Sequence, residues 1–375
     1  MRVLVAGDFV PQNRVASMVD RGDYGFFNNV IPITRQSDYS IINFESPIIE
    51  GTAKPIVKTG PSLQCHKNAM VAVKYAGFDC VTLANNHFYD FGDKGVSDTL
   101  KTCCECGIDS VGGGMNLKEA ESVLFKQLKN ETLAIINFCE NEWSIATNSS
   151  GGSAPLNIVH NTRAIQEARK QADYVLVIVH GGTEHYQLPS PRMKETYRFF
   201  IEQGADAVVN HHQHCFSGYE LYNNKPIFYG LGNFCFDKND SDNLLWNSGY
   251  VAQIEFKKTD VDYELIPYIQ CSEKSEIRFL TDKTEFEQKI ERLNEIIMND
   301  EALESSFEQM VQSHKSFLSV FEPGKNKYIK YMKSKGLLPR FVSQEKKDIF
   351  LELFRCEAHR DVMFELLKRK GFLGK

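Results

Sequence analysis

Short apolar runs alternate with amphipathic stretches over residues 1–271, and this alternation constrains the fold more than any other feature of the sequence. The runs expected to form strands are 3–6, 40–43, 79–83, 133–138, 174–180 and 207–210. The stretches with helical periodicity are 68–76, 94–106, 162–171 and 191–203. Such alternation is typical of a layered α/β fold, in which functional sites lie at the carboxyl ends of the strands.

The pattern changes after residue 210. The turn sequence Tyr222-Asn223-Asn224-Lys225 separates two apolar runs and predicts a hairpin, while 250–256 and 261–269 predict another strand pair. The sheet is therefore expected to contain antiparallel strands or to be split into two packed layers. Helix formers and charges dominate later, so we predict a domain over 1–271 and a helical C-terminal region over 272–375. The helices expected there are 286–298, 304–321, 327–335, 346–354 and 361–369.

Charge and apolar run lengths exclude several classes of protein. The 43 basic and 49 acidic side chains give a formal charge of −6, which argues against nucleic-acid binding. No apolar run reaches the ~18 residues of a membrane span, and the N-terminal run is too short for a secretory signal, so we expect a cytoplasmic protein without a membrane span. The ten cysteines are expected to be reduced core thiols, because the Cys103–Cys106 cluster has no second cysteine pair at zinc-site spacing.

Polar side chains follow the predicted strands. Carboxylate, amide and imidazole groups gather there, at Gly7-Asp8, Asn43-Phe44-Glu45, Asn85-Asn86-His87, His180 and His211-His212-Gln213-His214. Each alone has an ordinary interpretation as a cap, a turn residue or a hydrogen-bonded strand end. Together they form a mixed nitrogen and oxygen donor set, which suits Zn²⁺, Mn²⁺ or Fe better than Ca²⁺ or Mg²⁺. The sequence therefore predicts a metal site.

The order of these motifs resembles a known family. The motifs are Gly-Asp, Asn-x-Glu, Asn-Asn-His with a following Asp and Gly, His-x-Gly-x-Glu, His-His-x-His and Gly-Asn-Phe, within residues 1–240. This order resembles the CapA family of bacterial capsule, or poly-γ-glutamate, synthesis proteins, which resemble calcineurin-like metallophosphoesterases. The resemblance implies a layered α-β-β-α sandwich with a C-terminal helical appendage. It also implies a metal-dependent hydrolase of capsule or surface-polymer biosynthesis that cleaves a phosphoester or, less favoured, a γ-glutamyl amide bond.

The resemblance also implies roles for individual residues. One or two divalent ions (Mn, Zn or Fe) would be held by Asp8, Glu45, Asn86, His180, His212 and His214. The catalytic candidates are His87, as an acid that protonates the leaving oxygen or as a group that stabilises transition-state charge, and Glu184, as a general base. For Glu184 the alternatives are a metal ligand, a substrate anchor or a salt-bridged loop carboxylate. Residues expected to support the ligands or contact substrate are Asn43, Asn85, Asp90, His185, His211 and Asn233. The remaining histidines, expected to be ordinary, are His66, His160, His314 and His359.

Two departures from the metallophosphoesterase pattern leave an alternative open. Val10 stands where a ligand histidine is usual, and the bridging position holds Glu45 rather than an aspartate, so the first metal site is poorer in ligands. The alternative is a non-catalytic component that binds a small molecule or polymer and meets surface-polymer synthesis proteins through its helical tail. Loops 48–62 and 140–161 are expected to line the pocket, the second as a lid or a loose loop. For Lys54, Lys58 and Arg192 the favoured role is that of solvated surface cations, and the alternative is contact with an anionic substrate.

Overall fold

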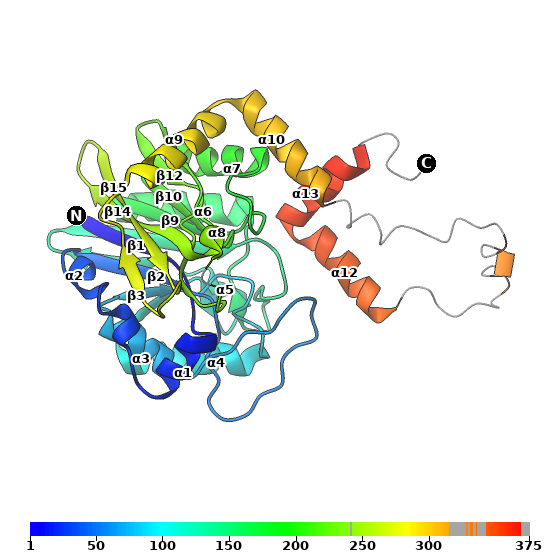
Figure 1. Cartoon of the computed structure of the whole chain (residues 1–375), viewed down its shortest axis with the longest axis horizontal. Helices are drawn as coiled ribbons and strands as arrows, with labels where there is room; N and C mark the ends of the chain where they lie inside the picture. The colour runs from blue at the N-terminus through cyan, green and yellow to red at the C-terminus, as the bar shows by residue number, and fades with distance from the viewer. Residues whose placement is uncertain (241, 315–327, 329–330, 333–334, 336–342, 369–375) are drawn as a thin grey trace.

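The predicted layered α/β fold is confirmed: two β-sheets pack face to face between helices (Figure 1). The computed structural model describes residues 1–240, 242–314, 328, 331–332, 335 and 343–368. Among these residues, no helix combines the length and the apolarity that crossing a bilayer requires.

The first sheet has the order β16-β15-β14-β1-β2-β3-β4, and β13 also pairs with β1. Strands β1 to β4 run parallel to one another and β13 runs parallel to β1, whereas β14 is antiparallel to β1 and β14, β15 and β16 are joined as antiparallel pairs. Its strands are β1 (Arg2–Val10), β2 (Tyr39–Phe44), β3 (Cys80–Thr82), β4 (Asp109–Val111), β13 (Asn233–Phe236), β14 (Ser248–Phe256), β15 (Val261–Gln270) and β16 (Ile277–Phe279).

The second sheet has the order β11-β12-β10-β9-β7-β6. Its strands are β6 (Leu124–Leu128), β7 (Glu131–Cys139), β9 (Tyr174–His180), β10 (Ala207–His211), β11 (Tyr219–Tyr222) and β12 (Lys225–Phe228). The predicted hairpin is confirmed as β11–β12, whose turn residues Asn223 and Asn224 both have positive φ, 51° and 58°. Two left-handed residues form the turn that matches strand twist, and asparagine tolerates this conformation. A small ribbon pairs β5 (Gly113–Gly114) with β8 (Gly152–Ser153).

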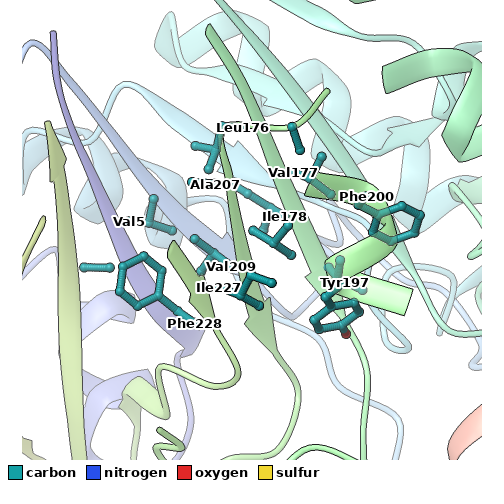
Figure 2. Packing of buried hydrophobic residues seen from close by; sticks show 14 of the residues in the cluster. Val5, Leu176, Val177, Ile178, Tyr197, Phe200, Ala207, Val209, Ile227 and Phe228 are labelled. Carbon is teal, nitrogen blue, oxygen red and sulfur yellow. The ribbon is translucent and has the colours of Figure 1, made fainter. Parts of the chain in front are cut away.

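Alternation along β1 explains why the two sheets pack together. Val3 and Val5 belong to the core between the sheets, whereas Leu4 and Ala6 belong to the core under the helices of the first sheet. Figure 2 shows side chains of β9, β10 and β12 between Val5 and the helix that covers the second sheet. Strand β9 is buried at every position, as expected for a central parallel strand covered on both faces.

Helices cover the outer faces of both sheets and complete the predicted α-β-β-α sandwich. Residues of α3 (Asn68–Tyr75) and α4 (Gly92–Cys106) pack on the first sheet, and residues of α6 (Ile158–Gln171) and α7 (Pro191–Glu202) pack on the second. The remaining helices before residue 272 are α1 (Asn13–Asp20), the 3₁₀ turn Gly25–Phe27, α2 (Ile31–Thr34), α5 (Leu117–Ala120) and α8 (Leu244–Asn247).

The C-terminal region is helical, as predicted. Its helices are α9 (Thr284–Met298), α10 (Asp300–Ser313), α12 (Gln344–Arg355) and α13 (Glu357–Lys368). The predicted helix 327–335 and the end of 304–321 lie largely outside the described residues. Strand β16 adds to the first sheet beyond residue 271, and α9 buries Phe286 and Ile290 in the core between the sheets. The domain division at residue 271 stays a prediction.

Candidate metal centre

Register in the two sheets brings the polar strand-end residues together. Asp8 pairs with Asn43 of β2 and with Asn233 of β13, and His211 pairs with His180 of the neighbouring β9. Asp8 lies inside β1 rather than at its end, because the strand continues to Val10 beside β13. The carboxyl ends of parallel strands share one edge of a sheet, so these side chains meet at one place.

One group of donor atoms surrounds His180. Its Nε2 lies 3.4 Å from Glu45 Oε1, 3.1 Å from Asn86 Oδ1 and 3.1 Å from His212 Nδ1. A single ring proton cannot serve three acceptors at once, whereas one cation can accept a lone pair from each of the four groups. Ligand atoms of Glu45, His180 and His212 all lie within 4.8 Å of one another. This arrangement fits a divalent metal ion.

A second group shares Glu45 with the first. Glu45 Oε1 lies 3.8 Å from His214 Nε2, and Asp8 Oδ2 lies 3.6 Å from His214 Nδ1. Ligand atoms of Asp8, Glu45 and His214 again lie within 4.8 Å of one another. Glu45 therefore lies where a carboxylate would bridge two cations.

The charge state of the buried groups tests whether a metal fits. Glu45 is fully buried, and neither of its carboxylate oxygens has a hydrogen-bond partner among the described residues. Burial and the charge of Asp8 raise the pKa of Glu45 well above its ordinary value. Burial lowers the pKa of His180 well below its ordinary value and that of His214 to about 4, so both imidazoles offer free lone pairs. A carboxylate without donors beside neutral imidazoles fits a divalent cation.

The turn after β10 holds two of these imidazoles in strained backbone. His212 and His214 have φ values of 90° and 54°, a region that favours glycine. Such a conformation costs about 1–3 kcal/mol per residue and persists where the surrounding structure determines it, often at functional sites. In this backbone conformation, His212 contributes to the first group of donor atoms and His214 contributes to the second.

Residues behind the donor atoms orient them. Asn43 Nδ2 donates to Asp8 Oδ1 at 2.7 Å and lies 3.3 Å from His180 Nδ1. Asn233 Oδ1 lies 2.9 Å from His214 Nδ1, which leaves the Nε2 atom of that ring for Glu45. His211 Nδ1 lies 3.3 Å from Asp8 Oδ1. Such partners fix the tautomer and orientation of metal-binding imidazoles.

His87 forms a second constellation beside the donor atoms. Its Nδ1 lies 2.7 Å from Asp90 Oδ2 and 3.2 Å from Lys58 Nζ, and Lys58 forms an ion pair with Asp90.

The Lys58 side chain is 4% exposed, so the expectation that Lys58 is solvated was wrong. Arg192 is also engaged, because its guanidinium pairs with Glu140 at 2.5 Å. Lys54 is exposed, as expected.

Three further predicted site residues also lie outside the donor groups. Glu184 lines the adjacent cavity but its side chain is 53% exposed, and although desolvation opposes ionisation, nearby His214 holds its pKa below the ordinary value. His185 is 48% exposed, with its ring centroid 6.4 Å from that of His214. Asn85 shapes the loop, because it donates to the carbonyl of Phe44 at 3.0 Å and accepts from the amide of His87.

A cavity of about 340 Å³ adjoins the donor groups. Both loops expected to line a pocket do so, and lining residues that sequence reasoning missed are Glu142, Trp143, Lys238, Trp246, Glu352 and His359. His359, which was expected to be ordinary, is one of these lining residues. The last two of these residues come from α12 and α13, and no motif in those helices marks them.

Val10 belongs to an apolar wall of this cavity. It is fully buried and clusters with Leu63, Phe236 and Trp246, three residues that line the cavity. The position where metallophosphoesterases usually have a ligand therefore contributes packing here. The structure brings together all six predicted ligands, and their metal-binding role stays a prediction.

Comparisons with known proteins identify the family. The family described as bacterial capsule synthesis protein PGA_cap matches residues 2–238. The capsule biosynthesis protein CapA of Bacillus anthracis is 33% identical over 247 residues, covering 64% of this chain and 60% of that protein. The PGA biosynthesis protein CapA of Bacillus subtilis (strain 168) is 30% identical over 299 residues, covering 76% of this chain and 79% of that protein.

The chain thus spans 60% of the length of the Bacillus anthracis relative. Among solved structures, the 5′-nucleotidase precursor from Thermus thermophilus is similar at a TM-score of 0.44 and 12% identity, covering 80% of this chain and 59% of that chain. The family match covers more than half of the chain, and its residues include the whole of both donor groups. This chain is a member of the bacterial capsule synthesis protein family PGA_cap.

Proposed function

We propose that this protein is a metal-dependent hydrolase of bacterial capsule or surface-polymer biosynthesis. The observation that carries the proposal is Glu45, a fully buried carboxylate without hydrogen-bond donors that belongs to both donor groups. Relatives named for capsule and PGA biosynthesis support the biological role. A Mycobacterium tuberculosis relative, at 26% identity, is named a probable polyglutamine synthesis accessory protein and supports a link to polymer synthesis.

One or two divalent ions would be held around Glu45. Asn86, His180 and His212 would complete one site, and Asp8 with His214 would complete the other. Metal ions bound there supply the positive charge that polarises a scissile phosphoryl or carbonyl group and activates water. A phosphoester is the favoured substrate, and a γ-glutamyl amide is the less favoured one.

His87 would act as the acid for the leaving group. The 2.7 Å contact with Asp90 occupies its Nδ1 atom, which leaves Nε2 for a group bound in the cavity that His87 lines. Burial lowers the pKa of His87, while Asp90 opposes that effect. Lys58 holds the Asp90 carboxylate in place, so the side chains of Asp90 and Lys58 position the imidazole rather than react.

Metal analysis and kinetics test this proposal together. Protein purified without added ions and then given Mn²⁺ or Zn²⁺ is expected to bind one or two equivalents and to cleave p-nitrophenyl phosphoesters. His87→Asn should keep the metal and lower kcat about 10²- to 10⁴-fold, because a positioned acid contributes that much. The exposed His66 provides the control variant His66→Asn, which should match wild type. A protein that takes up neither ion contradicts the proposal.

A non-catalytic assembly component is the second candidate. Val10 favours it, because an apolar wall replaces a usual ligand. Exposed apolar side chains on α12 and α13 also favour it, since they could meet a partner protein: Leu351 (47%), Phe354 (56%), Phe364 (55%) and Leu367 (51%). Metal-loaded wild type that stays at background with p-nitrophenyl phosphoesters and with γ-glutamyl p-nitroanilide supports this candidate over the hydrolase.

A further inference from the structure

Helices α12 and α13 reach the cavity beside the candidate metal centre, although they lie to one side of the sandwich (Figure 1). Glu357 at the start of α13 accepts hydrogen bonds from the backbone and side chain of Asn141, at 2.9 Å and 2.5 Å. Asp361 of α13 pairs with Arg192, and the guanidinium of Arg355 lies 5.4 Å from the ring centroid of Trp143. These contacts fix the helical pair against loop 140–143.

Because α12 and α13 pack in this way, the side chain of Glu352 on α12 reaches the cavity. It lines the cavity and is 6% exposed, and neither of its carboxylate oxygens has a hydrogen-bond partner among the described residues. The nearest ring nitrogen, Nδ1 of His359, lies 3.8 Å from Glu352 Oε1, which is long for an ion pair. Burial raises the pKa of Glu352 and the pKa of the neighbouring Glu142. The Oε1 atom of Glu142 lies 3.6 Å from His212 Nε2.

Two lysines line the same cavity, and both are engaged elsewhere. Lys58 pairs with Asp90, and Lys238 Nζ lies 3.3 Å from the ring centroid of Trp246. The Glu352 carboxylate is buried beside the acidic Glu142, and its nearest ring nitrogen lies 3.8 Å away, so a positively charged group of a ligand suits this position. A further metal ion suits it less well, because among the described residues the groups of three close ligand atoms are those around Glu45 and do not include Glu352.

We propose that Glu352, together with Glu142, forms a subsite for a primary ammonium group of the substrate. The substrate class is then an amine-bearing phosphoester or amide, with its cleavable bond at the metal centre. That placement of the bond rests on the proposed function, whereas the subsite itself consists of protein side chains. Carboxylates bind an ammonium through charge-assisted hydrogen bonds.

Binding of two matched ligands tests this subsite. Phosphoethanolamine and ethyl phosphate both carry a phosphate monoester, and phosphoethanolamine adds an ammonium group. Calorimetric titrations of the full chain, Mn²⁺-loaded and EDTA-treated, should show about 10-fold tighter binding of phosphoethanolamine to wild type, the range of a charge-assisted hydrogen bond. Glu352→Gln should remove that preference and leave binding of ethyl phosphate unchanged. Glu345→Gln, at an exposed glutamate of the same helix, should retain the preference.

Each other outcome has a defined meaning. Equal binding of the two ligands by wild type in both forms, or an unchanged preference in Glu352→Gln, overturns the subsite. Loss of one Mn²⁺ equivalent in Glu352→Gln also overturns it, because the carboxylate would then hold a metal. Failure of wild type to bind Mn²⁺ overturns the proposed function instead. In that case, the relative affinities of EDTA-treated protein for phosphoethanolamine and ethyl phosphate still show whether the subsite exists. Glu352→Gln keeps the size and shape of the side chain, so the variant should fold, and its circular dichroism spectrum checks this.

Discussion

Two regions of this protein meet at one cavity, and they are built in different ways. The donor groups around Glu45 are buried at a sheet edge, where strand register fixes their spacing. The helical pair α12–α13 is held by Asp361–Arg192, by Glu357–Asn141 and by a small apolar cluster that includes Leu353. The comparison teaches that the proposed chemistry rests on strand register within the sandwich, whereas the proposed selectivity rests on a helical pair held by a few side-chain contacts.

The largest expected effect concerns the sheet edge. Glu45→Gln removes the carboxylate shared by both donor groups, so metal-loaded protein should lose at least one metal equivalent and about 10²-fold or more of its phosphoesterase activity. The metal-free variant should melt at a higher temperature than metal-free wild type, because a buried carboxylate without donors is removed. Elemental analysis and thermal melts measure the two effects.

The exposed Glu285 of α9 gives the control Glu285→Gln, which should leave metal content and melting temperature unchanged. If Glu45→Gln instead keeps its full metal content, the sheet edge does not differ from the helical pair in the way we propose.

The sheet edge could be predicted from sequence because its signals are local. A strand pattern followed by a ligand-type residue, as at His180 and Glu45, gives both the place and the chemistry. The order of the motifs then implied the family, which the comparison with PGA_cap confirms. The end of β1 was less predictable, because its continuation to Val10 depends on pairing with β13, more than 200 residues later.

The helical wall could not be predicted, because its contacts are not local. Arg192 and Asp361 are 169 residues apart, and their pairing decides which face of α13 meets the cavity. Amphipathic periodicity in α12 predicts a helix but does not say which residues reach a site. Lys58 was misjudged for the same reason, because a lysine in a polar loop is usually solvated and its partner Asp90 comes from another segment.

A smaller effect is expected from a residue that orients a metal-binding imidazole without binding the metal itself. Asn233→Ala removes the partner of His214 Nδ1 and should lower Mn²⁺ or Zn²⁺ affinity about 10- to 100-fold, the usual cost of losing such a partner. The stoichiometry at saturating metal should stay as in wild type. Competition with a chelating dye measures the affinity, and the exposed Asn130 supplies the control Asn130→Ala. An unchanged affinity shows that strand register alone orients the imidazole.

A substitution in α13 should loosen the helical pair without affecting the donor groups at the sheet edge. Asp361→Asn weakens the ion pair with Arg192, so α12–α13 should open more often and be cleaved by trypsin about 10-fold faster, as a local opening free energy lower by about 1.4 kcal/mol implies. Metal content should not change. Asp348→Asn, on α12 away from Arg192, is the matched control, since Asp348 accepts from Gln344 within its own helix. Equal loss of metal and of protease resistance indicates that the two regions are one cooperative unit.

A change of pH also separates the two regions. The buried carboxylate of Asp237, after β13, accepts from Arg14 Nη2 at 2.8 Å and from Nε at 2.9 Å. Although burial opposes ionisation, these bonds hold the pKa of Asp237 below its ordinary value. A lowered folded-state pKa means that the pair stabilises the protein above the unfolded value of about 4, and that this contribution is lost as pH falls through the folded value.

Asp237→Asn should therefore lower the free energy of unfolding by about 1–3 kcal/mol at pH 7, with the difference from wild type shrinking below pH ~4. Urea titrations from pH 3 to 8 measure it, and Asp20→Asn, at an exposed position of the same helix as Arg14, should show no such trend. Cleavage of α12–α13 by pepsin, which works at acid pH, should not follow the pH dependence of this pair, because Arg14 and Asp237 join α1 to the end of β13. Parallel pH dependence of cleavage and unfolding means instead that acid loosens both regions together, and the helical pair then depends on the sheet edge for its stability.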